Sequence, residues 1–155
     1  MDLRDFDLSR FSYDRETGSI SSNGRVVGVK MRVGYLYVSL NHNQRTPAHR
    51  LAYFLVTGQQ PPAIDHVNGN RLDNRWMNLR AATIRENSYN TGRRADNTSG
   101  YKGVSWSAQK MKWRACIQLP SGKQKHIGFF ASLDAAYVAW AAAAKTIQGE
   151  FFHAG

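Results

Sequence analysis

The stretch that most constrains this chain runs from residue 65 to residue 87, with the sequence DHVNGNRLDNRWMNLRAATIREN. It opens with a carboxylate and an imidazole side by side, Asp65 and His66. A turn that contains glycine follows, then Asn78, and Asn87 ends the stretch. A hard oxygen ligand, a general base and an amide are the groups needed for metal-assisted cleavage of a phosphodiester. The sequence therefore predicts that one compact hairpin-and-helix unit brings these groups together.

The end of this stretch carries a helix start. Thr83 and Glu86 have the T-x-x-E spacing of a capping box, with Thr83 as N-cap and Glu86 at the third helical position. Asn87 is then expected in the first helical turn. The polar residues between the histidine and the helix are expected to form turns rather than to bind a ligand, because Asn and Asp side chains bond to their own backbone. These residues are Asn68, Asn70, Asp73 and Asn74.

The charge of the chain indicates a polyanionic partner. Lys and Arg number 21 against 11 acidic residues, a net charge of +10. The first 18 residues contain five of the acids and three of the arginines, so the rest of the chain, with 18 basic and six acidic residues, carries a net charge of +12. No carboxylate lies between Glu16 and Asp65. Asp65 is thus an isolated acid in a basic neighbourhood, as expected where a cation lies among phosphate-binding groups. A basic chain with no such partner is the alternative.

Two features bear on the cellular setting. Cys116 is the only cysteine, so a disulfide framework and a thiolate zinc cluster are excluded. The longest apolar run, residues 135–144, is too short to span a bilayer, and the first residues lack a signal-peptide pattern. We expect a soluble intracellular protein without membrane contact, in the cytoplasm of a bacterial host if a phage encodes it.

The segments before residue 65 are expected to form a small antiparallel sheet and a helix. Residues 11–40 read as short strands joined by turns, one of them at Asn23-Gly24. Residues 48–57 read as a buried helix that follows a proline and ends at a glycine. His49 and Arg50 at its start are near enough in sequence to reach Asp65. An active-site role and a purely structural role are both open for them.

The segment after residue 100 is expected to form a three-stranded antiparallel sheet packed on one helix. Residues 103–107, 112–119 and 124–130 read as the strands, and Ser132 caps an Ala-rich helix that ends at Gly149. Alternation along the second strand leaves Lys112, Arg114 and Gln118 on the open face, which could enter a DNA groove. A solvated face is the alternative. The fold class is α+β, with domains at 1–92 and 101–155 and a linker at 93–100.

The chain resembles the HNH endonucleases of the phage and homing type, which carry a ββα-metal site. The resemblance rests on His49-Arg-Leu, then Asp65-His66-x-x-Gly69-x-x-x-Asp73-Asn74-x-x-x-Asn78-Leu79, then Glu86-Asn87. Residues 97–155 resemble the APETALA/ethylene-response-factor DNA-binding domain. That second resemblance rests on Tyr101-Lys-Gly-Val104, Trp113, Gly128-x-Phe130 and the Ala-rich helix.

The first resemblance implies roles for four residues. Asp65 and Asn87 would be metal ligands, His66 the general base, and Asn78 the central amide that fixes the loop and orients His66. Asn87 stands where the family often has His, so the protein ligands carry oxygen only, which favours Mg²⁺ or Mn²⁺ over Zn²⁺. The implied activity is metal-dependent hydrolysis of a DNA phosphodiester, expected to nick one strand because the sequence contains one such set and no self-association element.

The second resemblance implies a surface that binds double-stranded DNA. Several positions that carry Arg in the plant-type domain carry other residues here, so its target sequence is not transferred. The residues expected to contact DNA are Arg93, Arg94, Lys102, Ser105, Ser107, Lys112, Arg114, Gln118, Gln124 and His126. Two other functions compete: a DNA-binding regulator with a degenerate nuclease unit, and an RNA-binding protein that stacks bases on its aromatic residues. The chain is expected to be a monomer.

Overall fold

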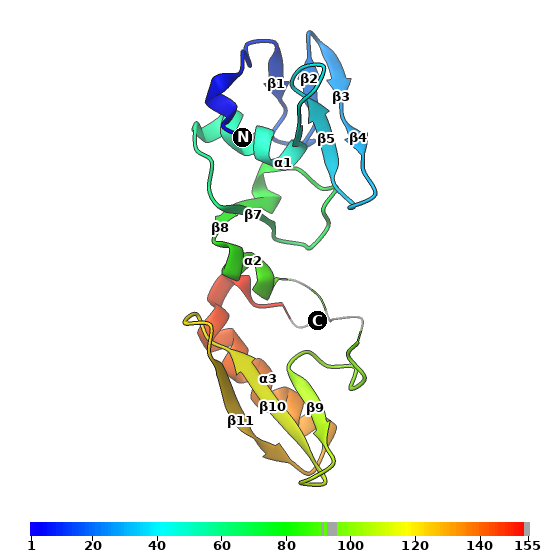
Figure 1. The fold of residues 1–155 in the computed structure, drawn as a ribbon, viewed down its shortest axis with the longest axis vertical. Coiled ribbons are helices and arrows are strands. Elements are labelled where there is room, and N and C mark those ends of the chain that lie inside the picture. The colour runs from blue at the N-terminus through cyan, green and yellow to red at the C-terminus, as the bar shows by residue number, and fades with distance from the viewer. Residues whose placement is uncertain (91, 93–95, 154–155) are drawn as a thin grey trace. The chain divides into compact units, whose positions relative to one another are not determined.

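A computed structural model describes residues 1–90, 92 and 96–153 of the chain (Figure 1). Its contacts divide the chain into two compact units, Met1–Ile84 and Arg85–Gly155. Small antiparallel sheets and helices make up both units, so the predicted α+β class is confirmed. The predicted domain limits at residues 92 and 101 stay predictions; the units themselves meet eight residues earlier, at the start of a helix.

The first unit is built from short strands around one central helix. Its elements are η1 (Leu3–Asp5), β1 (Phe11–Tyr13), β2 (Ile20–Ser22), β3 (Arg25–Val27), β4 (Val29–Lys30), β5 (Leu36–Ser39), β6 (Arg45–Pro47), α1 (Ala48–Thr57), β7 (Ala63–His66), η2 (Trp76–Asn78) and β8 (Leu79–Ala82). The helix α2 (Ile84–Tyr89) follows. It starts directly after Thr83, as the capping box predicts.

The strands expected between residues 11 and 40 are present, but they form two sheets. One has the order β1-β2-β3, with its last two strands joined at Asn23-Gly24 as predicted. The other has the order β4-β5-β6. The chain passes between them at Gly28, whose φ of +139° few other residues adopt. β6 was not expected, because its three residues end in a proline and lack alternation.

The helix α1 confirms the prediction for residues 48–57 at both ends. Pro47 occupies the N-cap position, and the N–H of Gly58 donates to the carbonyl of Phe54 at 2.8 Å. Leu51 and Ala52 are fully buried in a core shared with Val38, Ile64 and Leu79. This packing fixes α1 against β5 and against the hairpin β7–β8, which carries the candidate active site.

The second unit contains a three-stranded sheet packed on one long helix, as predicted. The strands are β9 (Val104–Ser107), β10 (Lys112–Gln118) and β11 (Gln124–Phe130), in the order β11-β10-β9, and the helices are α3 (Leu133–Gln148) and η3 (Gly149–Phe151). Figure 1 shows α3 along one face of this sheet. The Ser132 hydroxyl caps α3 by accepting from the Ala135 N–H at 3.2 Å.

Small residues bring α3 close to its sheet. Ala136 and Ala144 are fully buried, and Trp140 between them is 2% exposed. They pack against Val104, Ala115 and Ile117 of the sheet. In the described part of the chain, no helix is both long enough and apolar enough to cross a membrane.

Candidate active site

The hairpin β7–β8 positions the residues that open the motif. Its strands pair antiparallel, with Asp65 opposite Arg80 and His66 opposite Leu79. All four residues of β7 are buried. Neighbouring residues of a strand direct their side chains to opposite faces. Asp65 accordingly meets Arg80 on one face, and His66 meets a different set of partners on the other.

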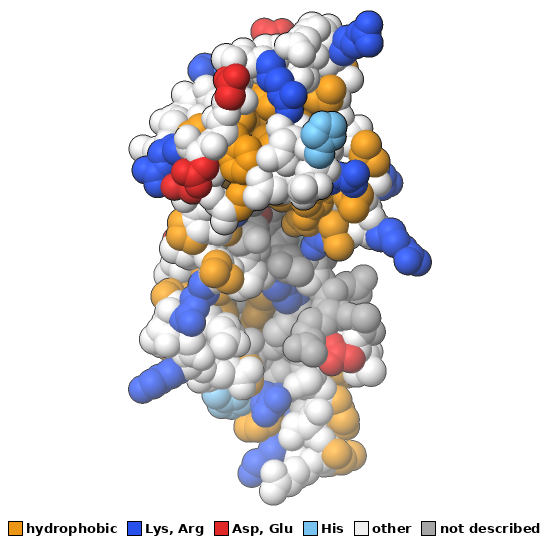
Figure 2. Space-filling view, turned by 45° about the horizontal axis from the view of Figure 1, so that its top comes forward, with side chains coloured by type: hydrophobic (Ala, Val, Ile, Leu, Met, Phe, Trp, Pro, Cys, Tyr) orange, Lys and Arg blue, Asp and Glu red, His pale blue; other side chains and the backbone are white. Residues whose placement is uncertain are grey.

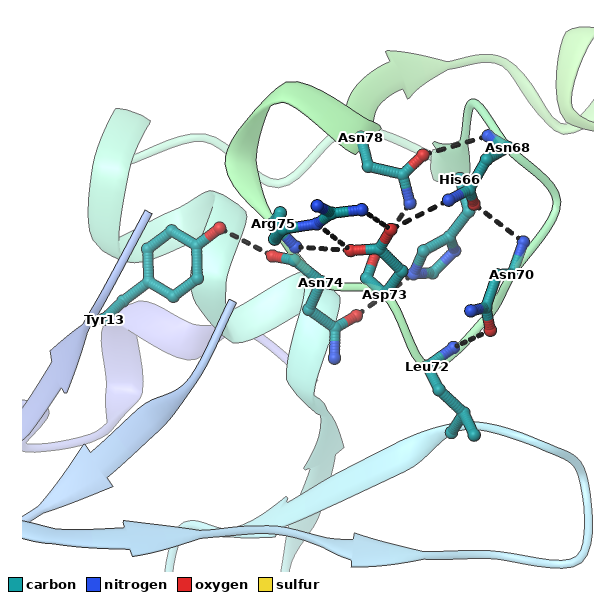
Figure 3. A network of polar contacts seen from close by, with 9 residues as sticks. All are labelled: Tyr13, His66, Asn68, Asn70, Leu72, Asp73, Asn74, Arg75 and Asn78. Atoms are coloured by element: carbon teal, nitrogen blue, oxygen red, sulfur yellow. Dashed lines mark hydrogen bonds and ion pairs between the residues drawn. The ribbon is translucent and has the colours of Figure 1, made fainter. Parts of the chain in front are cut away.

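The connection between the two strands is a loop built by its own Asn and Asp side chains, as predicted (Figure 3). The side-chain oxygen of Asn68 accepts from the N–H of Asn70 at 2.8 Å, and that of Asn70 accepts from the N–H of Leu72 at 3.1 Å. Asp73 accepts from the N–H of Arg75 at 3.3 Å. These local bonds satisfy backbone groups in a tight turn and fix the loop without regular structure.

Asn78 joins the two ends of this loop. Its side-chain Oδ1 accepts from the Asn68 N–H at 2.9 Å, and its Nδ2 donates to the Asp73 carbonyl at 2.7 Å. Its backbone carbonyl accepts from the Val67 N–H at 2.9 Å. Asn78 is 6% exposed, so these bonds are sheltered from water. The geometry is that of a loop-fixing amide.

The His66 ring lies among polar and aromatic groups and is 4% exposed. Its Nε2 is 3.1 Å from Oδ1 of Asn74, so the hydrogen bond described for this ring involves Asn74 rather than Asn78 (Figure 3). The His49 ring meets it edge-on at 5.0 Å, and the Tyr35 ring lies at 6.0 Å. Burial lowers the pKa of His66, while the bond to Asn74 and the Asp65 charge oppose that shift. A neutral ring at pH 7 is able to accept a proton.

Of the two supporting residues expected at the start of α1, the structure brings His49 to the His66 ring. His49 is 8% exposed, and burial lowers its pKa to about 3, with the charges of His66 and Arg50 adding to the shift. Arg50 instead donates to the carbonyls of Pro61 and Pro62, at 3.2 and 3.4 Å. Arg50 thereby holds the segment that enters β7.

Asp65 is 3% exposed and forms an ion pair with Arg80. Both Nη2 and Nε of Arg80 donate to the same carboxylate oxygen, Oδ2, at 2.6 and 2.8 Å. The Arg80 side chain is itself 15% exposed. Among residues 1–90, 92 and 96–153, no three His, Cys, Asp or Glu side chains lie close enough together to hold a metal ion. Asp65 is thus a buried carboxylate with a guanidinium beside it.

Asn87, the second residue expected to bind metal, lies on α2 and is half-buried. Apart from Ile84, this helix belongs to the second unit, and other residues of that unit bond to it. Lys102 donates from Nζ to the carbonyl of Tyr89 at 2.5 Å, and Arg85 donates from Nη1 to the carbonyls of Leu119 and Pro120. A cation at the last carbonyls of a helix is favourable. The role of Asn87 as a ligand stays a prediction.

The register of the second sheet places most of the residues expected to contact DNA on one face. Side chains directly opposite each other in antiparallel strands share a face. Trp113, Ala115 and Ile117 pack toward α3, so their neighbours in β10 face away from it. The residues of this face, called here the open sheet face, are Ser105, Ser107, Lys112, Arg114, Cys116, Gln118, Gln124, His126 and Phe129.

Two differences from the expected DNA-binding set appear. Lys102 is half-buried, burial lowers its pKa, and its ammonium group donates to the carbonyl of Tyr89, so its contact with DNA stays a prediction. Phe129 was not expected, yet it is 39% exposed on the open sheet face with its ring 4.7 Å from that of His126. Its orientation could not be predicted from the sequence, because the register of β10 against β11 shifts between Ala115 and Cys116 and side chains do not alternate regularly there. Arg93 and Arg94 lie outside the described residues.

Comparisons with known proteins find a match over the segment that contains the hairpin β7–β8. Residues 46–89 match the family model for HNH endonucleases. The chain is also 46% identical over 61 residues to Protein 3.8 of Escherichia phage T7, a match that covers 39% of this chain and 50% of that protein. The chain thus spans about half the length of the curated relative it matches. No solved structure matches it. Because the family model ends at residue 89, the likeness of residues 97–155 to a plant-type DNA-binding domain stays a prediction.

Proposed function

We propose that this chain is a metal-dependent endonuclease of the homing type that hydrolyses one phosphodiester of double-stranded DNA. The observation that carries the proposal is the His66 ring. It is buried with a lowered pKa, lies next to Asp65 in sequence, and is held by the loop of a segment that matches the HNH endonucleases. A ring that is neutral at pH 7 and fixed in orientation suits a general base.

The donor set fits a hard divalent cation. Asp65 supplies a buried carboxylate, and its neighbour Arg80 holds that group in one orientation. Mg²⁺ is commonly bound through only one or two carboxylates, with phosphate oxygens and water completing its shell. Asn87 is proposed as the second protein ligand from its place in the motif alone. A bound Mg²⁺ or Mn²⁺ would stabilise the charge that develops on the phosphate.

The His66 ring takes a proton from the attacking water in the proposed reaction. As that O–H bond breaks, the water oxygen forms a bond to phosphorus and the bond from phosphorus to the 3′ oxygen breaks. The leaving oxygen takes a proton from solvent, so the products are a 3′ hydroxyl and a 5′ phosphate. The ring becomes an imidazolium whose nearest charged neighbour in sequence is Asp65.

The open sheet face is proposed to hold the DNA. It carries Lys112, Arg114 and His126 together with hydrogen-bonding Ser and Gln side chains, a composition that suits phosphate and base contacts. The surface in Figure 2 carries many Lys and Arg side chains and few acidic ones, in keeping with the net charge of +10. Affinity from this face would hold the substrate while the HNH domain acts.

Incubation of supercoiled plasmid with the full chain tests the function. We expect open-circular product with Mg²⁺ or Mn²⁺ and none when EDTA is present. Tight binding of duplex without cleavage in any metal would instead indicate a regulator with an inactive nuclease unit. Preferential binding of single-stranded RNA over duplex DNA in competition would indicate an RNA-binding protein.

A further inference from the structure

Asn74 was expected only to form a turn, yet its side chain points to the proposed general base. It is 2% exposed, and its Oδ1 lies 3.1 Å from Nε2 of His66. A buried polar group that loses its hydrogen-bond partner destabilises the fold. The bond between Asn74 and His66 therefore requires that both side chains are held in place. The contacts that hold Asn74 therefore determine the geometry of His66.

Those contacts come from the β1–β2 hairpin, far away in the sequence. The Tyr13 hydroxyl donates to the backbone carbonyl of Asn74 at 2.6 Å (Figure 3). Gly18 packs so closely that a Cβ there would lie 2.5 Å from the carbonyl carbon of Asn74. The N–H of Trp76 donates to the carbonyl of Arg15 at 2.9 Å. Three contacts thus grip residues 74–76 from a hairpin that lies outside the segment matched by the family model.

We propose that Asn74, gripped by the β1–β2 hairpin, is a positioning residue that keeps the Nε2–H tautomer of His66 and so makes Nδ1 the atom that accepts the proton from water. The chemistry follows from the bond to Oδ1. An amide oxygen only accepts, so the imidazole nitrogen facing it carries the hydrogen. In a neutral ring the lone pair then lies on Nδ1. When Nδ1 takes the proton, the Asn74 carbonyl stabilises the imidazolium through the same bond.

In this proposal the β1–β2 hairpin helps to position the general base. The Tyr13 hydroxyl, the close backbone contact at Gly18 and the Arg15 carbonyl connect it to the segment that begins at Asn74, whose side chain bonds to the His66 ring. The consequence for catalysis rests on the proposed nuclease function, but the tautomer itself does not depend on substrate. The two can therefore be measured apart.

Nitrogen-15 NMR of the uniformly labelled full chain without DNA, at pH 7, measures the tautomer directly. We expect His66 to show a protonated Nε2 and an unprotonated Nδ1, with an Nε2 hydrogen that exchanges slowly with water. A protonated Nδ1 in the wild-type protein would overturn the proposal. That result needs no variant and no activity.

Three variants test the contacts that hold Asn74 and His66. In Asn74→Leu, we expect the two ring nitrogens to shift toward each other, the Nε2 hydrogen to exchange rapidly, and kcat for plasmid nicking to fall about tenfold with little change in KM. Asn74→Asp keeps an oxygen acceptor and should retain the Nε2–H tautomer. Tyr13→Phe removes one hydroxyl and should speed the exchange of the Nε2 hydrogen. Asn43→Leu, in the exposed β5–β6 turn, is the control that changes none of these.

The outcomes separate the two proposals. Wild-type exchange and wild-type kcat in both Asn74→Leu and Tyr13→Phe would overturn the positioning role. If Asn74→Leu fails to fold, the wild-type spectrum and Tyr13→Phe decide it. An Nε2–H tautomer in a chain that cleaves no DNA would leave the positioning role standing and contradict the nuclease function instead.

Discussion

His49 and His66 lie with their rings 5.0 Å apart, and burial lowers the pKa of each. Since a protonated ring is poorly solvated in such a place, both rings are neutral at pH 7 in the folded chain. His66 has a polar partner in Asn74, whereas His49 packs between aromatic rings. At the residue scale, the site therefore contains one ring with a polar partner, the proposed base His66, and a second ring, His49, that packs against it.

The pH dependence of nicking follows from the lowered pKa of His66. The base acts in its neutral form, so the rate should fall as the pH drops through the folded-state pKa. That midpoint should lie below 6.5, the ordinary value for a histidine. The measurement is kcat for plasmid nicking from pH 5 to pH 8 at saturating metal. A midpoint above 6.5 would contradict the neutral, buried ring.

The pH dependence of stability should reflect His49. Its pKa is about 3 in the folded chain and near 6.5 in the unfolded chain, so the unfolded chain binds the proton first as the pH falls. The stability contributed by a neutral His49 is present at pH 7 and is lost progressively between about pH 6.5 and pH 3. From pH 7 to pH 5 the loss should be about 2 kcal/mol. Urea unfolding of wild type and His49→Phe measures it; equal losses in both proteins would contradict the assignment.

At the scale of elements, the sequence predicted the helix limits that depend on residues close to the helix ends. The limits of α1 and α3 were predicted because proline, glycine and a capping serine act within one turn. The contact between Asn74 and His66 was not predicted, since it depends on Tyr13, 61 residues away. The ion pair of Asp65 and Arg80 was likewise missed, because it requires the register of β7 against β8. The two contacts that the sequence did not predict therefore both depend on how distant segments pair in the fold.

The packing of α3 on its sheet gives a stability prediction for the second unit. Trp140 is 2% exposed and contacts Tyr137 and Phe152 as well as the sheet core. Trp140→Ala should lower the free energy of unfolding by about 3 to 5 kcal/mol through the cavity it leaves. Val138→Ala, on the exposed side of the same helix, is the matched control and should change it little. Comparable losses in both variants, measured by urea denaturation, would contradict the packing.

The open sheet face gives a binding prediction. Arg114→Gln should weaken affinity for duplex DNA and reduce the slope of log affinity against log salt by about one, because one phosphate contact is lost. Lys145→Gln, an equal change of charge on an exposed position of α3, should leave the slope unchanged. Titrations of labelled duplex at several salt concentrations measure both. Equal effects of the two variants would indicate that only net charge matters.

At the scale of the whole molecule, the chain contains one segment that matches the HNH endonucleases and one three-stranded sheet that carries the open sheet face. In the proposed reaction, one general base and one set of oxygen ligands hydrolyse one phosphodiester at a time. Supercoiled plasmid should therefore become open-circular before any linear form appears, which a time course on agarose gels measures. Linear product at the earliest times, without an open-circular precursor, would require two sites acting together and would contradict a monomeric nicking enzyme.

The proposed role of His66 as the general base of a metal-dependent nuclease can be tested by comparing three proteins. Plasmid nicking with Mg²⁺ and binding of the same DNA with EDTA are measured for the wild type, His66→Ala and His42→Ala, the last removing an exposed histidine as control. We predict that His66→Ala loses nicking by a factor on the order of a hundred or more while its DNA affinity stays within about twofold. His42→Ala should behave as the wild type in both measurements. Nicking by His66→Ala at the wild-type rate would contradict the claim.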